Sequence, residues 1–130
     1  MRILLADDQI DIRSALRLLL EQDESSWQVV QEVENFSQLL KEVEVHHPDM
    51  ILLDWELQGF APLSRATARQ PRPDIIGELK ALRPELKIMV LSGRIESQAE
   101  ALAAGADAFV SKGDPPERLL EKLHQFDQSN

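Results

Sequence analysis

The chain of 130 residues contains no cysteine, so it can form neither a disulfide framework nor a thiolate metal site. It also lacks an apolar run long enough to span a bilayer. The first residues, Met1-Arg2-Ile3-Leu4-Leu5, lead toward two acids without the apolar core of a secretory signal. These absences predict a soluble cytoplasmic protein that does not bind membranes.

Positive charge is scarce as well. The 14 Lys and Arg residues are outnumbered by 23 Asp and Glu residues, which gives a formal net charge of −9. A surface of this sign repels phosphate backbones and anionic lipids, so we expect no direct contact with nucleic acid. Apolar residues, by contrast, make up 43% of the chain, enough for the core of one domain. We therefore predict a single domain over residues 1–130.

Five short apolar runs alternate with segments of helical periodicity. The runs, predicted as strands, are residues 3–6, 28–33, 50–54, 87–91 and 107–111. The run at 50–54 is apolar as far as Asp54, which is typical of a central parallel strand buried on both faces. Helices are predicted from Ile10, after an Asn35 cap, over 74–83, over 96–104 and after Asp114. This alternation predicts a parallel sheet with helices on both faces.

Local patterns within the predicted helices add detail. Asn35 and Gln38 have the spacing of a capping box. Gly105 is expected to end the helix over 96–104. In the helix over 74–83, the apolar face expected to point into the core consists of Ile75, Ile76, Leu79 and Leu82.

Polar residues stand at the ends of four of the predicted strands. They are Asp7 and Asp8 after the first, Asp54 at the end of the third, Ser92 after the fourth and Lys112 after the fifth. Because the carboxyl ends of parallel strands meet at one edge of a sheet, we expect these side chains to converge. Taken alone, Asp54 could simply end a strand and start a turn. A hydroxyl and an ammonium at matching strand ends favour a functional site instead.

The expected cluster has a definite chemistry. Three neighbouring carboxylates repel one another, and they relieve the repulsion by sharing a proton or by binding a hard cation. One lysine cannot neutralise them, whereas Mg²⁺ held by carboxylates and water can, and such sites normally serve a phosphoryl group. Asp54 could then attack phosphorus as a nucleophile, with Lys112 stabilising the charge on the transferred group and Ser92 binding the product.

Together these motifs resemble the receiver domain of bacterial two-component response regulators. The shared features are Asp7-Asp8, Asp54 after Ile-Leu-Leu, Ser92 after Val-Leu, and Ala104-Gly105-Ala106 followed by Phe109 and Lys112. The resemblance covers essentially the whole chain. It implies an α/β fold with a five-stranded parallel sheet of order 2-1-3-4-5 flanked by five helices, the flavodoxin-like or CheY-like arrangement.

The resemblance also implies a role for each polar residue. Asp54 is the implied site of phosphorylation. The implied Mg²⁺ ligands are Asp7 through water, Asp8, Asp54 and the backbone carbonyl of Glu56. The implied switch residues are Ser92, whose hydroxyl moves toward the phosphoryl group, Phe109, whose ring changes rotamer, and Lys112, whose ammonium pairs with the phosphoryl group.

The implied function is a signalling switch. It would take a phosphoryl group from a sensor histidine kinase or a phosphotransfer protein and signal to a downstream output protein or domain. The resemblance also allows the chain to associate with a second copy of itself as a homodimer. A domain of this kind phosphorylates and dephosphorylates itself, so we do not expect a turnover enzyme. The alternative from a different class is a protein-interaction module that keeps the fold without being phosphorylated.

One enzyme and one nucleotide-binding protein are further alternatives, and the sequence fits both less well. An aspartyl-phosphate phosphatase of the haloacid dehalogenase type needs a second acid two residues after the nucleophile, which Glu56 matches only in part. A flavodoxin-like nucleotide binder needs Ser, Thr or Gly in its phosphate loop, where this chain has Asp7 and Asp8.

The sequence departs from the family pattern in three places. The loop over about 57–73 is extended, and its Arg65 and Arg69 either belong to a solvated segment or steer the phosphodonor. The spacing from Ser92 to Lys112 is shorter than usual, so the helix between them must be trimmed. Gly113 follows the lysine, and whether that peptide bond is cis is left open. At the mouth of the pocket, Glu56 and Arg94 are expected to pair and to tune hydrolysis of the phosphoryl group.

Overall fold

The computed structural model describes residues 1–23, 27–57 and 74–128. Its centre is a parallel sheet of five strands in the order β2-β1-β3-β4-β5. The strands are β1 (Arg2–Ala6), β2 (Gln28–Val33), β3 (Met50–Asp54), β4 (Lys87–Ser92) and β5 (Ala108–Ser111). The predicted fold class, strand order and parallel pairing are therefore confirmed, with strand bounds that shift by one residue.

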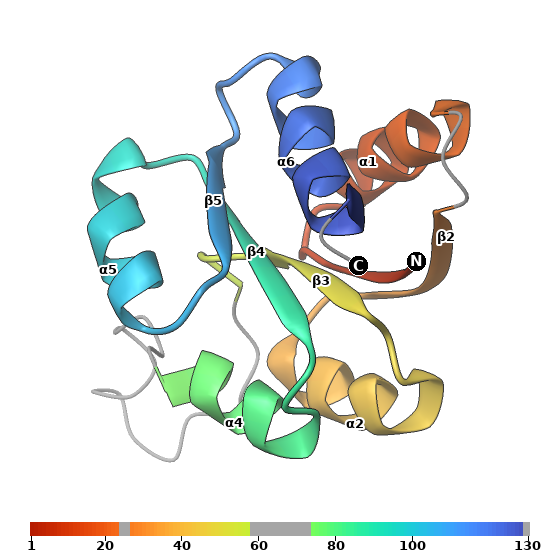
Figure 1. Cartoon of the computed structure of the whole chain (residues 1–130), viewed down its shortest axis with the longest axis vertical. Coiled ribbons are helices and arrows are strands. Elements are labelled where there is room, and N and C mark those ends of the chain that lie inside the picture. Colours follow the sequence, from red (N-terminus) through yellow and green to blue (C-terminus); the bar gives the residue numbers. More distant parts are fainter. Residues whose placement is uncertain (24–26, 58–73, 129–130) are drawn as a thin grey trace.

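Five α-helices and one 3₁₀ turn surround this sheet in the part of the chain that the structure describes. They are α1 (Ile10–Gln22), α2 (Phe36–His46), α4 (Asp74–Leu82), the 3₁₀ turn η1 (Ile95–Ser97), α5 (Gln98–Ala103) and α6 (Pro116–Gln128). Helices α1 and α6 cover one face of the sheet, and α2, α4 and α5 cover the other (Figure 1). None of these helices combines the length and apolar character needed to cross a membrane.

Strand β3 is buried along its whole length, as its unbroken apolar run predicts. Successive side chains of a strand point to opposite faces, so Ile51 and Leu53 join the core under α2 and α4 while Leu52 joins the core under α1 and α6. Two hydrophobic layers therefore hold β3 in place. Asp54, the last residue of β3, is presented at the sheet edge by a rigid element.

The predicted caps are largely correct. The Asn35 side chain accepts a hydrogen bond from the Gln38 backbone N–H at 2.9 Å, and the Gln38 side chain accepts one from the Glu34 N–H at 3.0 Å. At the end of α5, Gly105 adopts φ 112°, a left-handed conformation that suits glycine. The Gly105 N–H donates to the Leu102 carbonyl and the Ala106 N–H to the Ala101 carbonyl, the two bonds of a Schellman motif.

One predicted core residue is wrong. Leu82 is 39% exposed, although Ile75, Ile76 and Leu79 on the same helix are buried. The helix ends at Leu82, and the chain then turns back so that Leu86, which is 1% exposed, fills the core.

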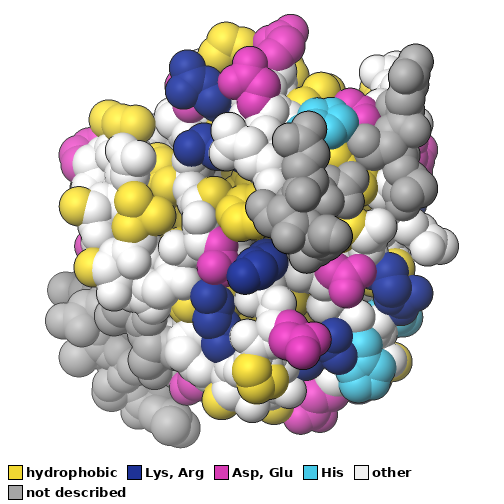
Figure 2. Space-filling model, in the orientation of Figure 1, with side chains coloured by type: hydrophobic (Ala, Val, Ile, Leu, Met, Phe, Trp, Pro, Cys, Tyr) yellow, Lys and Arg dark blue, Asp and Glu magenta, His cyan; other side chains and the backbone are white. Residues whose placement is uncertain are grey.

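The segment between β4 and β5 is short, as its spacing predicts. A 3₁₀ turn replaces the first turn of the predicted helix, and α5 has only 6 residues. Ala101 is its one fully buried side chain, whereas Ile95 and Leu102 are 59% and 43% exposed. Figure 2 shows the resulting apolar patch over α5, at the left of the molecule.

Candidate functional site

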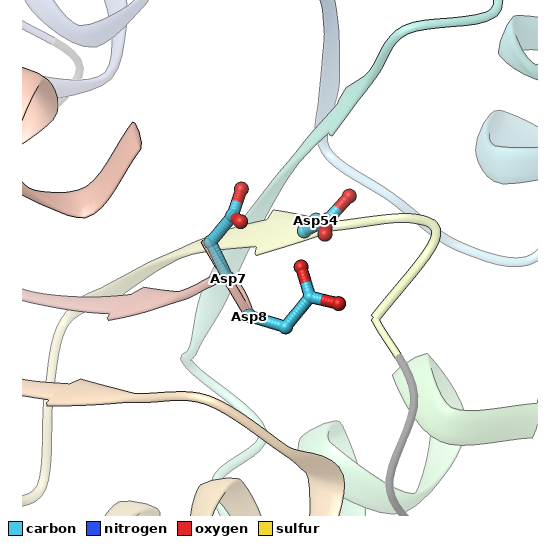
Figure 3. Close-up of side chains that lie close together, drawn as sticks. All are labelled: Asp7, Asp8 and Asp54. Atoms are coloured by element: carbon cyan, nitrogen blue, oxygen red, sulfur yellow. The ribbon is translucent and has the colours of Figure 1, made fainter. Parts of the chain in front are cut away.

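Three carboxylates meet at the carboxyl edge of the sheet. Asp7 and Asp8 directly follow β1, and Asp54 ends the neighbouring β3. Each offers an oxygen atom within 4.8 Å of the other two, and Figure 3 shows Asp8 and Asp54 directed toward the same space. Asp7 and Asp54 are buried, at 3% and 2% exposure, while Asp8 lies at the surface. The predicted convergence of these acids is confirmed.

The ammonium of Lys112, the residue that follows β5, reaches the same cluster. Its Nζ lies 3.0 Å from Asp7 Oδ2 and 3.1 Å from Asp54 Oδ1. The Lys112 backbone N–H also donates to the Ser92 carbonyl at 2.8 Å, which ties the ends of β4 and β5 together. Lys112 therefore bridges the two buried acids, as the placement at matching strand ends predicts. The described residues contain no cis peptide bond, so the Lys112–Gly113 bond is trans.

The buried acids and the lysine perturb one another. Burial, reinforced by the negative charge of Asp7, raises the pKa of Asp54 to about 6, although Lys112 acts in the opposite direction. Burial disfavours the ammonium of Lys112, but the charges and hydrogen bonds of Asp54 and Asp7 outweigh it and raise the pKa of the lysine. One cation thus faces three carboxylates, which leaves unbalanced negative charge at the rim.

The backbone around the cluster holds the acids in place. The side chain of Asp7 accepts a hydrogen bond from the Gln9 N–H at 2.9 Å, and that of Asp54 accepts one from the Glu56 N–H at 3.1 Å. Each of these hydrogen bonds closes a turn in which an Asp side chain accepts from the backbone N–H two residues further along the chain. From α1, the guanidinium of Arg13 donates to the Asp7 carbonyl at 2.6 Å and to the Glu32 carboxylate at 3.1 Å.

The residues fit a hard divalent cation. Carboxylate oxygens are the ligands that Mg²⁺ prefers, and a metal–oxygen distance of about 2.1 Å places two ligands at most about 4.2 Å apart. Oxygen atoms of Asp7, Asp8 and Asp54 all lie within 4.8 Å of one another, a spacing that suits such an ion bound directly or through water. Asp7, Asp8 and Asp54 would hold the ion, which would neutralise the charge that Lys112 leaves unbalanced. No other group of three or more metal-ligating side chains occurs among the described residues.

Ser92 lies at the same edge but makes a contact that the sequence did not predict. Its hydroxyl donates to Glu56 Oε1 at 2.6 Å and accepts from the Arg94 N–H at 3.0 Å. The Gly93 N–H donates to the same Glu56 oxygen at 3.2 Å. The expected pairing of Glu56 with Arg94 is therefore wrong, because Glu56 contacts Ser92 and Gly93 and no ion pair joins it to Arg94 within the described chain. The role of the Glu56 carbonyl as a metal ligand stays a prediction.

Phe109 is buried on β5, at 5% exposure, in the core that also contains Trp55, Ile76 and Ala101. Its ring is thus in an inward position, and its role as a switch stays a prediction. The Arg65 and Arg69 predictions fall in the segment 58–73, which lies outside the described residues.

The histidines take no part in the cluster. His46 pairs with Glu42 at 2.9 Å on the same helix, and His124 contacts Asp23 at 3.2 Å and the ring of Trp27.

Comparisons with known proteins agree with this geometry. The family described as response regulator receiver domain matches residues 3–124. The nitrate/nitrite response regulator protein NarL of Escherichia coli (strain K12) is 32% identical over 123 residues, which cover 95% of this chain and 53% of NarL. The phosphate regulon transcriptional regulatory protein PhoB of the same strain is 28% identical over 126 residues, covering 94% of this chain and 49% of PhoB.

A solved structure shows the same fold. The isolated REC domain of RcsB from Salmonella enterica serovar Typhimurium, in the presence of the phosphomimetic BeF3⁻, superposes with a TM-score of 0.84 at 22% identity. The match covers 98% of this chain and 88% of that one.

The sheet order and the acid cluster with its lysine agree with the family match, which assigns the chain to the two-component signalling class. The chain belongs to the response regulator receiver domain family, whose match extends over nearly all of its length. It spans about half the length of the curated relatives it matches.

Proposed function

We propose that the chain accepts a phosphoryl group on Asp54 in a reaction that depends on Mg²⁺. The donor would be a phosphohistidine of a sensor histidine kinase or of a phosphotransfer protein. The observation that carries this proposal is the placement of Asp54 against Lys112 within a cluster of three carboxylates, at the end of a strand buried on both faces. A phosphorylated switch needs these features together, whereas a strand-ending acid needs none of them.

The chemistry follows from the charges. An oxygen of the Asp54 carboxylate attacks phosphorus, the bond from phosphorus to the imidazole nitrogen breaks, and the nitrogen keeps the electron pair and is protonated from solvent. The bound cation would supply charge stabilisation to the phosphoryl oxygens. Lys112, released from part of its pairing with Asp54, would supply the second positive charge, and Ser92 a hydrogen bond to the product.

The phosphorylated form would lose its phosphoryl group by slow hydrolysis, so the chain would act as a switch and not as a turnover enzyme. Output would pass through another chain or through a further domain. PhoB is named a transcriptional regulatory protein, and one solved structure is of RcsB bound to the promoter rprA. The expectation that this chain itself avoids nucleic acid has no support from these relatives, and it rests on the net charge of −9 alone.

The decisive test is phosphorylation by a small acyl-phosphate donor, followed by intact mass. With Mg²⁺ the wild-type chain should gain one phosphoryl group, and with a chelator it should gain none. Asp54→Asn should remain unmodified, whereas Asp11→Asn, which changes an exposed acid on α1, should react as the wild type does. A wild-type chain that gains no phosphoryl group, or an Asp54→Asn chain that gains one, would remove the proposal and leave the interaction module as the better reading.

A further inference from the structure

We propose that the Glu56 side chain is an internal competitor of the phosphoryl group, holding Ser92 in its unphosphorylated position until phosphorylation displaces it. This inference rests on the function proposed for Asp54. It assigns a positioning role to a side chain for which the sequence suggested only a backbone contact and a pairing with Arg94.

The contact is specific. The Glu56 carboxylate receives two hydrogen bonds on one oxygen, from the Ser92 hydroxyl at 2.6 Å and from the Gly93 N–H at 3.2 Å. Ser92 itself is fully buried, whereas Glu56 is exposed. The exposed carboxylate of Glu56 therefore lies against the sheet edge and accepts a hydrogen bond from a buried hydroxyl. This bond is short and charge-assisted, which makes it stronger than a hydrogen bond between neutral groups.

Glu56 and the two donors lie beside the proposed acceptor. The Glu56 backbone N–H bonds to Asp54 Oδ1, so the turn that presents the carboxylate starts at Asp54 itself. On the neighbouring strand, Leu91 pairs with Asp54, and Ser92 is one residue further toward the edge. A phosphoryl group on Asp54 would enter the rim to which both donors belong.

The competition follows from proton counting. A serine hydroxyl can donate one hydrogen bond, and here the Ser92 hydroxyl donates it to Glu56. The hydroxyl oxygen accepts a second hydrogen bond from the Arg94 N–H. Ser92 cannot donate to Glu56 and to a phosphoryl oxygen at once. The bond to Glu56 must break before the hydroxyl can bind the phosphoryl group.

Charge acts in the same direction. The Glu56 carboxylate adds negative charge next to Ser92, two residues after Asp54, at an edge that already carries Asp7, Asp8 and Asp54 and where Lys112 pairs with Asp7 and Asp54. A phosphoryl group adds further negative charge, so it repels the carboxylate at the same time as it takes its donors. Glu56 can then swing into water, because its side chain is already exposed.

Affinity for beryllofluoride in saturating Mg²⁺ measures this competition, since that ion mimics a phosphoryl group on a carboxylate. Glu56→Ala should bind beryllofluoride about tenfold more tightly than the wild type, which corresponds to the loss of one charged hydrogen bond. Glu56→Asp keeps the charge but shortens the side chain, and it should also bind more tightly. Glu96→Ala, which removes an exposed acid from the 3₁₀ turn after β4, should bind as the wild type does. Isothermal titration calorimetry gives all four affinities.

Amide hydrogen exchange in the metal-free protein checks the contact without any phosphoryl analogue. The Gly93 amide should exchange faster in Glu56→Ala than in the wild type, and Glu96→Ala should leave it unchanged. Equal beryllofluoride affinities for the wild type and Glu56→Ala would overturn the competition while leaving phosphorylation of Asp54 intact, and so would a Glu56→Asp chain that binds as the wild type does. Absence of beryllofluoride binding by every variant would remove both proposals together.

Discussion

The two edges of the sheet use the same residue types in opposite ways. At the amino edge, the Asp49 side chain accepts the Arg2 backbone N–H at 2.8 Å, and Asp107 accepts the Ile88 N–H at 2.8 Å while pairing with Lys80 at 3.0 Å. Each acid there has its own donors. At the carboxyl edge, the two buried acids Asp7 and Asp54 share the ammonium of Lys112, and the exposed Asp8 adds a third carboxylate to the cluster. The acids of the amino edge thus act separately as acceptors for neighbouring backbone, whereas the gathering of acids at the carboxyl edge indicates a functional site.

Removing the shared cation should have the largest effect on stability. Lys112→Ala leaves the buried Asp7 and Asp54 without a cationic partner, so we expect the metal-free protein to lose about 2–4 kcal/mol of unfolding free energy. Lys80→Ala, the matched change at the amino edge, should cost less than about 1 kcal/mol, because Lys80 and Asp107 are more exposed. Urea unfolding of both variants in a chelator measures the difference. Equal losses would show that the two edges are electrostatically alike.

Mg²⁺ should neutralise the excess negative charge of the carboxyl edge and should have no comparable effect at the amino edge. At a concentration one hundred times its dissociation constant, the ion should stabilise the wild type by about 2.7 kcal/mol. Asp54→Asn should lose most of this gain, and Asp49→Asn should retain it. Thermal unfolding with and without Mg²⁺ provides the measurement, and a gain that is the same in all three proteins would place the ion elsewhere.

The same titration can be followed by Trp55 fluorescence. Trp55 is next to Asp54 and 7% exposed, and its indole N–H has no hydrogen-bond partner among the residues that the structure describes. Trp27→Phe removes the second tryptophan, which contacts His124 on the other face of the sheet. Emission that stays constant as Mg²⁺ binds would contradict the placement of the ion beside Trp55.

A further effect should appear with pH in the absence of metal. The pKa of Asp54 is raised in the folded chain, from 3.8 to about 6, so between these values the folded state binds more protons than the unfolded state. The contribution of Asp54 to stability should therefore fall as the pH rises from about 4 to about 6. Asp54→Asn lacks this contribution, so it should be the more stable protein above pH 6 and close to the wild type near pH 4. A stability difference that does not change with pH would contradict the raised pKa.

Much of the fold and of the rim could be predicted because both follow from short-range patterns. Apolar runs locate the strands, and the rule that parallel strands end at one edge brings Asp7, Asp54 and Lys112 together before any coordinate is known. The shortened α5 follows from the spacing of Ser92 and Lys112.

The missed features depend on where individual side chains and helix ends lie. The hydrogen bond from Ser92 to Glu56 requires a particular side-chain rotamer of each residue. The periodicity of a sequence carries no information on such rotamers, so this contact could not be predicted. Leu82 has the right spacing for the core, but the helix ends there and Leu86 takes the place. The paired Asp107 also shows that a charged residue at a strand end is ambiguous until its partners are known.

The hydrogen bond from the Lys112 N–H to the Ser92 carbonyl links two residues whose side chains have different roles in the proposed reaction. Any main-chain displacement at the end of β4 must either break this 2.8 Å bond or carry the end of β5 with it. As long as the bond holds, a rearrangement around the Ser92 hydroxyl would move the end of the strand that bears Phe109, independently of the acids.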